Sequence, residues 1–193
     1  MTNSTPNQSS LHPPDEVLML QVLEKNQQAF NLLVRRWKHP LVNYFYRQLG
    51  ETERAEELAQ EVFVKVWKTK KYQAQARFST WLYRLAYHVL VDHWRSQGRR
   101  PAQFEPLEDQ ALELPSPAAG PEQLALQAET RQHLQAALAT LPAQQRQILV
   151  LSKFEDLKYS QIAEIVNCPE NQVKVQVFRA VQNLGKKLKE LIK

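Results

Sequence analysis

The sequence predicts an all-α protein made of two small helical domains joined by an acidic linker. Apolar residues recur at helical spacing over 15–97 and again from 122 onward, with almost no strand-like alternation. Between these stretches, residues 101–121 contain five prolines, and no helix of useful length fits between them. We therefore expect a disordered N-terminus at 1–14, a helical domain at 15–100, a flexible linker at 101–121 and a second, separately folded helical domain at 122–193.

The distribution of charge indicates a polyanionic partner. The chain of 193 residues has a net charge of +5. Residues 1–100 carry +6, residues 101–130 carry −6 and residues 131–193 carry +5. Two basic domains suit a nucleic acid. The acidic strip between them is also suited to cover a basic domain transiently within the same chain.

Helix-ending and helix-starting residues divide the first domain. Proline has no backbone N–H, so Pro40 is expected in the first turn of a helix over 41–49. Gly50 suits the end of that helix, and Thr52 suits the cap of the next one. That next helix has glutamates in its first turns and lysines near its end, as the helix dipole favours.

A polar connection and an aromatic, basic helix follow. Helical periodicity is lost over 71–77 and returns over 78–97. The polar connection suits the capture of an extruded base. In the helix, aromatic rings alternate with basic residues, which suits stacking on unpaired bases and contact with the phosphate backbone. We interpret Phe78 and Trp81 as core residues. The cations that are hard to explain as core are Arg84, His88 and Arg95.

The second domain contains a helix-turn-helix pattern. A short helix is expected over 160–166, a turn over 167–171 and a second helix over 172–184. The second helix of such a motif lies in the major groove of DNA. The expected buried stripe consists of Val173, Val177, Ala180, Val181 and Leu184. The side chains left for DNA are Gln172, Lys174, Val175, Gln176 and Arg179. A plain helical hairpin with a polar face is the alternative interpretation of this segment.

Together the two segments resemble an RNA polymerase sigma factor of the extracytoplasmic-function type, group 4 of the sigma-70 family. The stretches AEELAQEVFVKVW and FSTWLYRLAYHVLVDHWRSQGRR look like region 2, over 15–100. The stretch LKYSQIAEIVNCPENQVKVQVFRAVQNL looks like region 4, over 134–188. Two separate matches in this order are more specific than either one. The resemblance implies that region 2 binds core polymerase and the −10 promoter element, while region 4 reads the −35 element.

The resemblance also implies roles for individual residues. Those that would face core polymerase are Glu57, Gln60, Glu61, Phe63 and Trp67. Those that would meet the −10 element, with 72–77 holding a flipped base, are Tyr72, Gln73, Gln75, Arg77, Arg84, His88, Arg95, Arg99 and Arg100. Those that would read the −35 element are Gln172, Lys174, Val175, Gln176 and Arg179. Three departures stand out: Lys158 replaces a capping Ser or Thr, Asn171 replaces a turn glycine, and Val175–Gln176 replaces a common Ser-Arg pair.

The implied protein is a cytoplasmic, non-enzymatic specificity subunit that acts in a stress response. Its implied partners are core RNA polymerase, promoter DNA and an anti-sigma factor that is often membrane-bound. The chain has four glycines and one cysteine, without a phosphate-binding loop or a metal-binding motif, so we expect no cofactor, metal or small-molecule substrate. The alternative function is a stand-alone helix-turn-helix transcription regulator, which would need neither the Glu57, Gln60 and Glu61 face nor the aromatic, basic helix.

Overall fold

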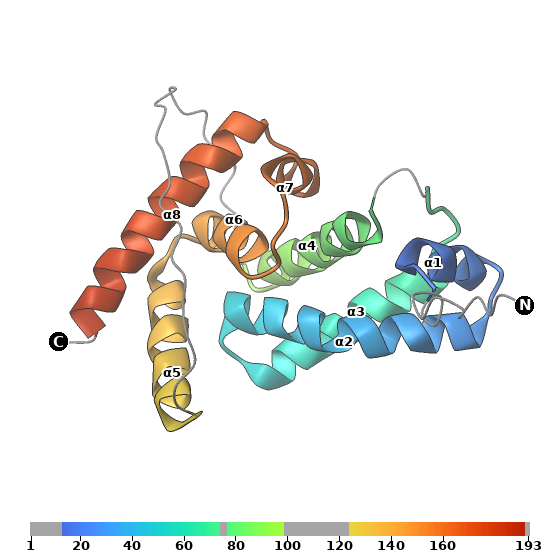
Figure 1. Cartoon of the computed structure of the whole chain (residues 1–193), viewed down its shortest axis with the longest axis horizontal. Helices are drawn as coiled ribbons and strands as arrows, with labels where there is room; N and C mark the ends of the chain where they lie inside the picture. The colour runs from blue at the N-terminus through green and yellow to red at the C-terminus, as the bar shows by residue number, and fades with distance from the viewer. Residues whose placement is uncertain (1–12, 74–76, 99–123, 192–193) are drawn as a thin grey trace, which may run out of the picture.

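The structure, a computed structural model, describes residues 13–73, 77–98 and 124–191, which form eight α-helices and no strand (Figure 1). The all-α prediction is therefore confirmed. Helices α1–α4 form an N-terminal lobe and α5–α8 a C-terminal lobe. Their bounds are α1 Asp15–Leu23, α2 Gln27–Leu49, α3 Thr52–Lys68, α4 Phe78–Ser96, α5 Leu124–Thr140, α6 Ala143–Lys153, α7 Tyr159–Val166 and α8 Glu170–Leu191. Residues 1–12 of the expected N-terminal tail and the linker 101–121 lie outside the described residues.

Helix α2 is one continuous helix rather than two. It begins after Asn26, whose side-chain oxygen accepts hydrogen bonds from the backbone N–H groups of Gln28 and Ala29 at 3.0 and 3.1 Å. It ends at Gly50, whose φ of 80° is a left-handed conformation that suits glycine. The expectation that a new helix begins at Pro40 is wrong. A proline removes one helical hydrogen bond, but the apolar face of α2 packs into the core on both sides of it.

Helix α3 packs between α2 and α4 through an apolar stripe. The stripe includes Leu58, Val62 and Val66, which recur every four residues and are buried. Thr52 is the first residue of the helix, and Glu51 occupies the cap position without a side-chain capping bond. The prediction that Thr52 is the cap is therefore wrong by one position.

Helices α7 and α8 form the predicted helix-turn-helix, but the turn differs in detail. The left-handed residue is Asn167, with φ of 53°, whereas Asn171 lies inside α8. Asparagine tolerates this conformation better than most residues. Before α7, the backbone N–H of Lys158 donates to the side-chain oxygen of Gln161 at 3.0 Å. This bond is one half of a capping box, and it offsets the missing Ser or Thr at Lys158.

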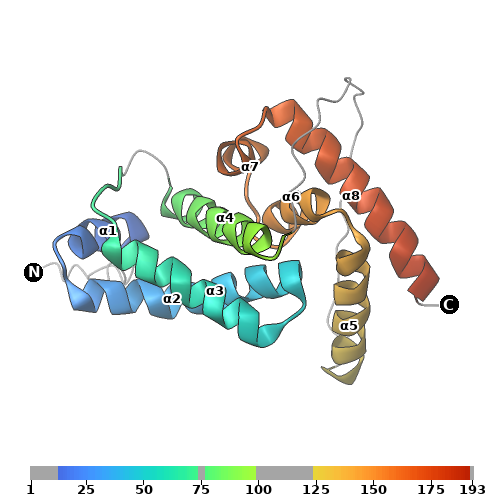
Figure 2. The same ribbon diagram turned by 180° about the vertical axis from the view of Figure 1, so that it is seen from behind.

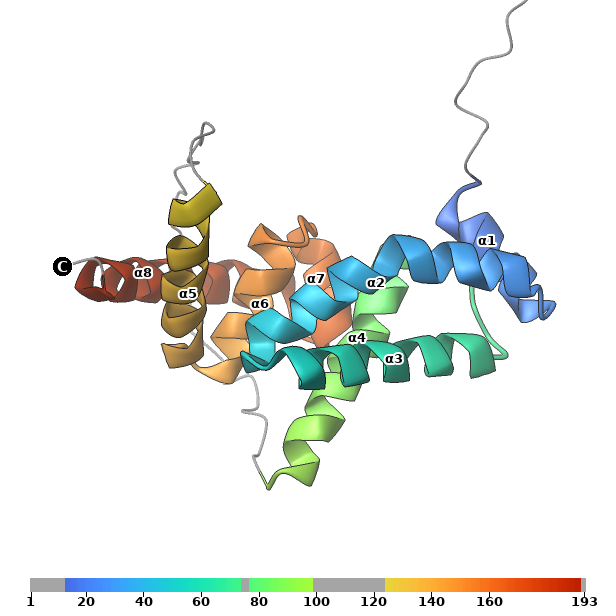
Figure 3. The same cartoon turned by 90° about the horizontal axis from the view of Figure 1, so that it is seen from below.

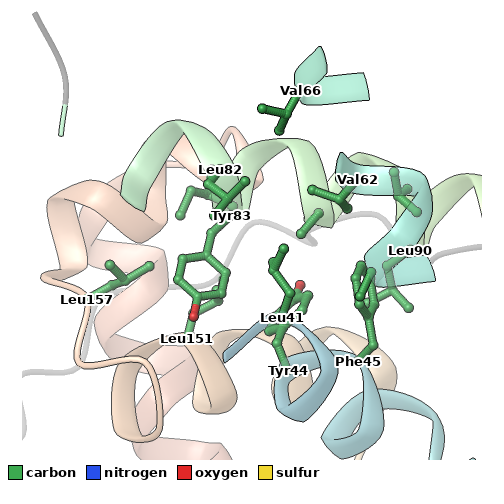
Figure 4. Packing of buried hydrophobic residues seen from close by; sticks show 14 of the residues in the cluster. Leu41, Tyr44, Phe45, Val62, Val66, Leu82, Tyr83, Leu90, Leu151 and Leu157 are labelled. Carbon is green, nitrogen blue, oxygen red and sulfur yellow. The ribbon is translucent and has the colours of Figure 1, made fainter. Parts of the chain in front are cut away.

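The two lobes pack against each other, which we call the closed arrangement. Helix α4 contacts α7, and α2 contacts α6 (Figures 2 and 3). One cluster of buried apolar side chains contains members of both lobes. Figure 4 shows Tyr83 of α4 and Tyr44 of α2 in the same cluster as Leu151 and Leu157 of the C-terminal lobe. This structure therefore differs from the expectation of two separate lobes, because apolar side chains of both lobes pack in one buried cluster.

Candidate nucleic-acid interface

The outer face of α3 is polar with one exposed apolar residue. Glu57, Gln60 and Glu61 are exposed, as predicted, and 48% of Val64 is exposed. These four residues lie on one side of the helix because they are spaced three or four positions apart. Val64 was not predicted from the sequence, although its spacing of four from Gln60 was the available signal.

The aromatic residues predicted for this face lie largely inside the lobe. Phe63 is only 8% exposed, so the expectation that it is available to a partner is wrong. Its ring stands edge-on to Phe30 at 6.5 Å, on the apolar side of α3. Trp67 is half-buried, with the centre of its ring 5.0 Å from that of Phe30.

Tyr72, at the start of the connection between α3 and α4, is also buried. It is 7% exposed, and its ring lies edge-on to Phe78 and Trp81 at 6.2 and 5.2 Å. Burial, followed by the charges of Glu16 and Asp15, raises the pKa of Tyr72 to about 12, so the phenol is neutral at pH 7. The Tyr72 side chain is therefore not available to hold a flipped base in the closed arrangement, contrary to the expectation.

The other predicted site residues of the connection between α3 and α4 are exposed where the structure describes them, as expected for a surface that meets DNA. Gln73 and Arg77 are exposed, whereas Gln75 lies outside the described residues. Phe78 is buried, which confirms that it is a core residue, whereas Trp81 is half-buried and packs against that core.

Helix α4 carries an exposed cationic stripe. Arg84, His88 and Arg95 are all exposed, and their spacings of four and seven place them on one side of the helix. The opposite side is buried in the core. Arg95 lies 3.6 Å from Asp92 in an exposed ion pair. Such a pair is worth little in water, so it leaves Arg95 available to a phosphate. The predicted residues Arg99 and Arg100 lie outside the described residues.

Helix α8 presents a second polar face. Gln172 and Val175 are partly exposed and Arg179 is exposed, and the spacings of three and four align them on one side. Lys174 is exposed and pairs with Glu170 at 3.1 Å. Lys174 and Arg179 can contact phosphate or guanine, Val175 can contact a thymine methyl group, and Gln172 can hydrogen-bond adenine.

Gln176 is not part of that face. It is 6% exposed, and its side-chain oxygen has no hydrogen-bond partner among the described residues. The prediction that Gln176 is available to DNA is therefore wrong in the closed arrangement, because the residue lies beside the buried stripe of Val173 and Val177. Val181, predicted to be buried, is exposed, and Leu184 is only partly buried.

Polar contacts between the lobes surround Glu155, a residue that the sequence did not single out. Its carboxylate accepts a hydrogen bond from the hydroxyl of Tyr83 and lies 3.4 Å from the guanidinium of Arg47. Burial raises the pKa of Glu155, while the bond from Tyr83 and the charge of Arg47 oppose that rise. Nearby, the side-chain amide of Gln161 donates to the hydroxyl of Thr80 at 2.7 Å. Helices α4 and α7 are thus bonded directly.

The described residues include no group of three or more His, Cys, Asp or Glu that could hold a metal ion. Cys168 is a free, half-buried thiol, and burial raises its pKa. Among the helices in the described ranges, none is long and apolar enough to cross a membrane.

Family models and curated relatives identify the chain. The model described as Sigma-70 region 2 matches residues 33–100, and the model described as Sigma-70, region 4 matches residues 131–184. The ECF RNA polymerase sigma-E factor of Escherichia coli is 31% identical over 185 residues, which cover 93% of this chain and 96% of the relative. The RNA polymerase sigma-H factor of Pseudomonas aeruginosa is 29% identical over the same shares.

Solved structures share the fold. CnrH, in complex with the cytosolic domain of CnrY, matches with a TM-score of 0.68 and 21% identity, over 91% of this chain and 97% of that one. RpoE of Bartonella quintana, in complex with the anti-sigma factor NepR, matches with a TM-score of 0.63 and 23% identity, over 83% and 96%. The chain belongs to the extracytoplasmic-function group of the sigma-70 family. It is a transcription initiation factor, not an enzyme, and it directs RNA polymerase to promoters.

Proposed function

We propose that three helices of this sigma factor each bind a different partner surface: α3 binds core polymerase, α4 the −10 element and α8 the −35 element. The outer face of α3, defined by Glu57, Gln60, Glu61 and Val64, docks on core RNA polymerase, with the half-buried Trp67 beside it. One exposed apolar side chain among charged and amide groups has the composition of a non-obligate protein interface. In this assignment residues 15–100 act as region 2.

The cationic stripe of α4 binds the −10 element. Arg84 and Arg95 supply positive charge along one side of the helix, with the His88 imidazole between them, and Gln73 and Arg77 extend that surface at the helix start. Binding of unpaired bases by the protein offsets the free-energy cost of unstacking them, and basic side chains neutralise the phosphates of the strand.

The outer face of α8, with Gln172, Lys174, Val175 and Arg179, reads the −35 element as the second helix of a helix-turn-helix. Residues 122–193 then act as region 4.

The closed arrangement cannot serve both promoter elements at once. The −10 and −35 elements are named for their positions in the promoter. They lie about 25 base pairs apart, which is about 85 Å along B-DNA. The helices assigned to them are held together, since Thr80 beside the α4 stripe bonds to Gln161 in the helix-turn-helix. We therefore propose that the lobes separate when the factor engages polymerase and promoter. The 25 residues 99–123 that join them can span about 80 Å when extended.

The interface between the lobes contains buried polar groups that reduce its stability, which suits an interface that opens. It buries the Glu155 carboxylate, and desolvation of a charge offsets much of what its partners contribute. The hydroxyl of Tyr44, in the same cluster, is buried without a hydrogen-bond partner among the described residues. An unpaired buried group of this kind costs about 1–3 kcal/mol.

An anti-sigma factor is proposed as a further partner. Two proteins of the same fold were solved as complexes, one with the anti-sigma factor NepR and one with the cytosolic domain of CnrY. A membrane-bound protein with a cytosolic domain would suit this chain as well. Because it acts on RNA polymerase and DNA, we propose that the protein works in the cytoplasm, in a stress response.

The observation that carries the proposal is the presence of both sigma-70 regions on lobes whose outer faces remain exposed. The test is transcription in vitro with purified core polymerase on a pool of genomic promoters. The proposal predicts transcripts from a subset of promoters that share two upstream motifs. A chain that binds promoter DNA but yields no transcript with core polymerase would favour the stand-alone regulator.

A further inference from the structure

Helix α1, together with the turn that follows it, reaches both ends of the connection between α3 and α4. At the α3 end, Lys25 donates from Nζ to the backbone carbonyl of Trp67 at 2.9 Å, and its ammonium lies 5.1 Å from the centre of the Trp67 ring. At the α4 end, the backbone N–H of Phe78 donates to Oε1 of Glu16 at 2.8 Å. Figure 3 shows the turn between α1 and α2 near the end of α3 where this connection begins.

The charges match the helix ends that they contact. The last carbonyl groups of a helix carry partial negative charge, and the first N–H groups carry partial positive charge. Lys25 places a cation on the end of α3, and Glu16 places an anion on the start of α4. The cap position of α4, Arg77, makes no side-chain capping bond, and its first turn contains no acidic residue. The negative charge at the start of α4 is therefore supplied by α1 rather than locally.

Helix α1 is itself fixed to α2. The carboxylate of Asp15 accepts hydrogen bonds from Arg36 at 2.7 Å and from the indole N–H of Trp37 at 3.0 Å. The Trp37 ring then packs edge-on to Phe78 at 5.8 Å. The buried side of α1 consists of Leu18, Met19 and Val22. A side chain held on this helix therefore has a defined position relative to α2 and α4.

We infer that Glu16 and Lys25 are positioning residues for promoter opening. They hold the start of α4, and with it the cationic stripe, in a fixed orientation relative to the polymerase-docking face of α3. Both residues precede residue 33, where the match to region 2 begins. The inference rests on the proposed function of α3 and α4, and it adds that their relative orientation depends on α1 and the turn after it, which precede the matched region.

The experiment measures promoter opening by the full chain with core polymerase, using a fluorescent base analogue within the −10 element. The variants are Glu16→Ala, Lys25→Ala and their combination. We expect opening to slow about threefold to tenfold in each single variant, because each loses one charge-assisted bond at a helix end. Affinity for core polymerase should stay unchanged, since the outer face of α3 is intact. Glu16→Gln, which keeps a hydrogen-bond acceptor, should restore part of the rate.

Two controls separate positioning from stability. Glu24→Ala changes an exposed carboxylate next to Lys25 and should have no effect. Val22→Ala removes methyl groups from the buried side of α1, and it should lower the melting temperature without slowing opening in proportion. Template that is already unpaired at the −10 element should restore the rate of the Glu16 and Lys25 variants.

The outcomes of this experiment are distinct. Opening rates that follow the melting temperature alone, with Val22→Ala as slow as Glu16→Ala at equal stability, would overturn the inference. The same holds if Glu16→Ala and Lys25→Ala open the promoter as fast as the natural chain while Arg84→Ala with His88→Ala is slow. If that last pair is also without effect, the proposed role of α4 is itself wrong.

Discussion

The hydroxyl of Tyr83 donates a hydrogen bond to the carboxylate of Glu155, and this bond joins the second turn of α4 to the segment between α6 and α7. The guanidinium of Arg47 lies 3.4 Å from the same carboxylate and 4.5 Å from the centre of the Phe154 ring. Glu155 thus lies at the junction of the lobes, with one hydroxyl and one cation from the N-terminal lobe directed at it.

The pH dependence of closure should report on Glu155. Its pKa is raised above the ordinary value of 4.5 when the lobes are closed, and it returns toward that value when the lobes separate. The closed arrangement therefore binds more protons, and its stability is greatest at low pH and falls as pH rises through the raised pKa. With one fluorescent dye on each lobe, fluorescence energy transfer between the dyes should decrease as the pH rises through the raised pKa of Glu155. Glu155→Gln should remove that part of the pH dependence, and an unchanged curve in this variant would contradict the assignment.

Docking on polymerase should depend on the outer face of α3. Gln60→Ala with Val64→Ala should weaken binding to core polymerase about tenfold, because the substitutions shorten the side chains that anchor the interface. Leu20→Ala, which shortens an equally exposed apolar side chain on α1, is the matched control. Fluorescence anisotropy with core polymerase measures both. Equal affinities for the two variants, with helical circular dichroism intact, would place the docking face elsewhere.

Opening of the −10 element should depend on the cationic stripe of α4. Arg84→Ala with Arg95→Ala should slow opening on every promoter. The log–log slope of affinity against salt should fall by about 0.7–0.9 for each phosphate that the helix no longer neutralises. Arg35→Ala, an exposed arginine on α2, serves as the control. Permanganate footprints of unpaired thymines that are identical for all three proteins would show that the stripe is only solvated surface.

Base preference at the −35 element should follow the outer face of α8 and not Gln176. Val175→Arg should change the preferred base at one or two positions, by about 1–3 kcal/mol per bidentate contact. Gln176→Arg should instead lower the melting temperature, because it places a charge in a buried position. Selection from randomised upstream DNA, together with thermal melting, distinguishes the two. A new motif for Gln176→Arg at unchanged stability would mean that this residue does face DNA.

The sequence predicted the helices and the charged exposed faces, because periodicity and helix-end chemistry are local properties. Gly50 ends α2, and Arg84, His88 and Arg95 are exposed as their spacing indicates. The effect of Pro40 was not predictable in this way, because the core on both sides of it outweighs one missing hydrogen bond.

The wrong site residues have one cause in common. Phe63 and Gln176 lie at the edge of an apolar stripe, where helical spacing alone does not decide burial, and Tyr72 lies in the connection between two helices, where no periodicity applies. Whether these side chains are buried depends on residues far away in the sequence, as Phe30 packs against Phe63. Glu155 and Arg47 were missed for the same reason, since 108 residues separate this pair.

Separation of the lobes is tested most directly by holding them closed and measuring transcription. Thr80→Cys and Gln161→Cys, in a Cys168→Ala background, place two thiols where a hydrogen bond now joins α4 to α7. A short thiol-reactive cross-linker with a reducible bond would keep the arrangement closed. We predict that the cross-linked chain with core polymerase gives no transcript from a promoter with both elements, and that reduction restores it. Equal transcription before and after reduction would contradict the claim that the lobes must separate.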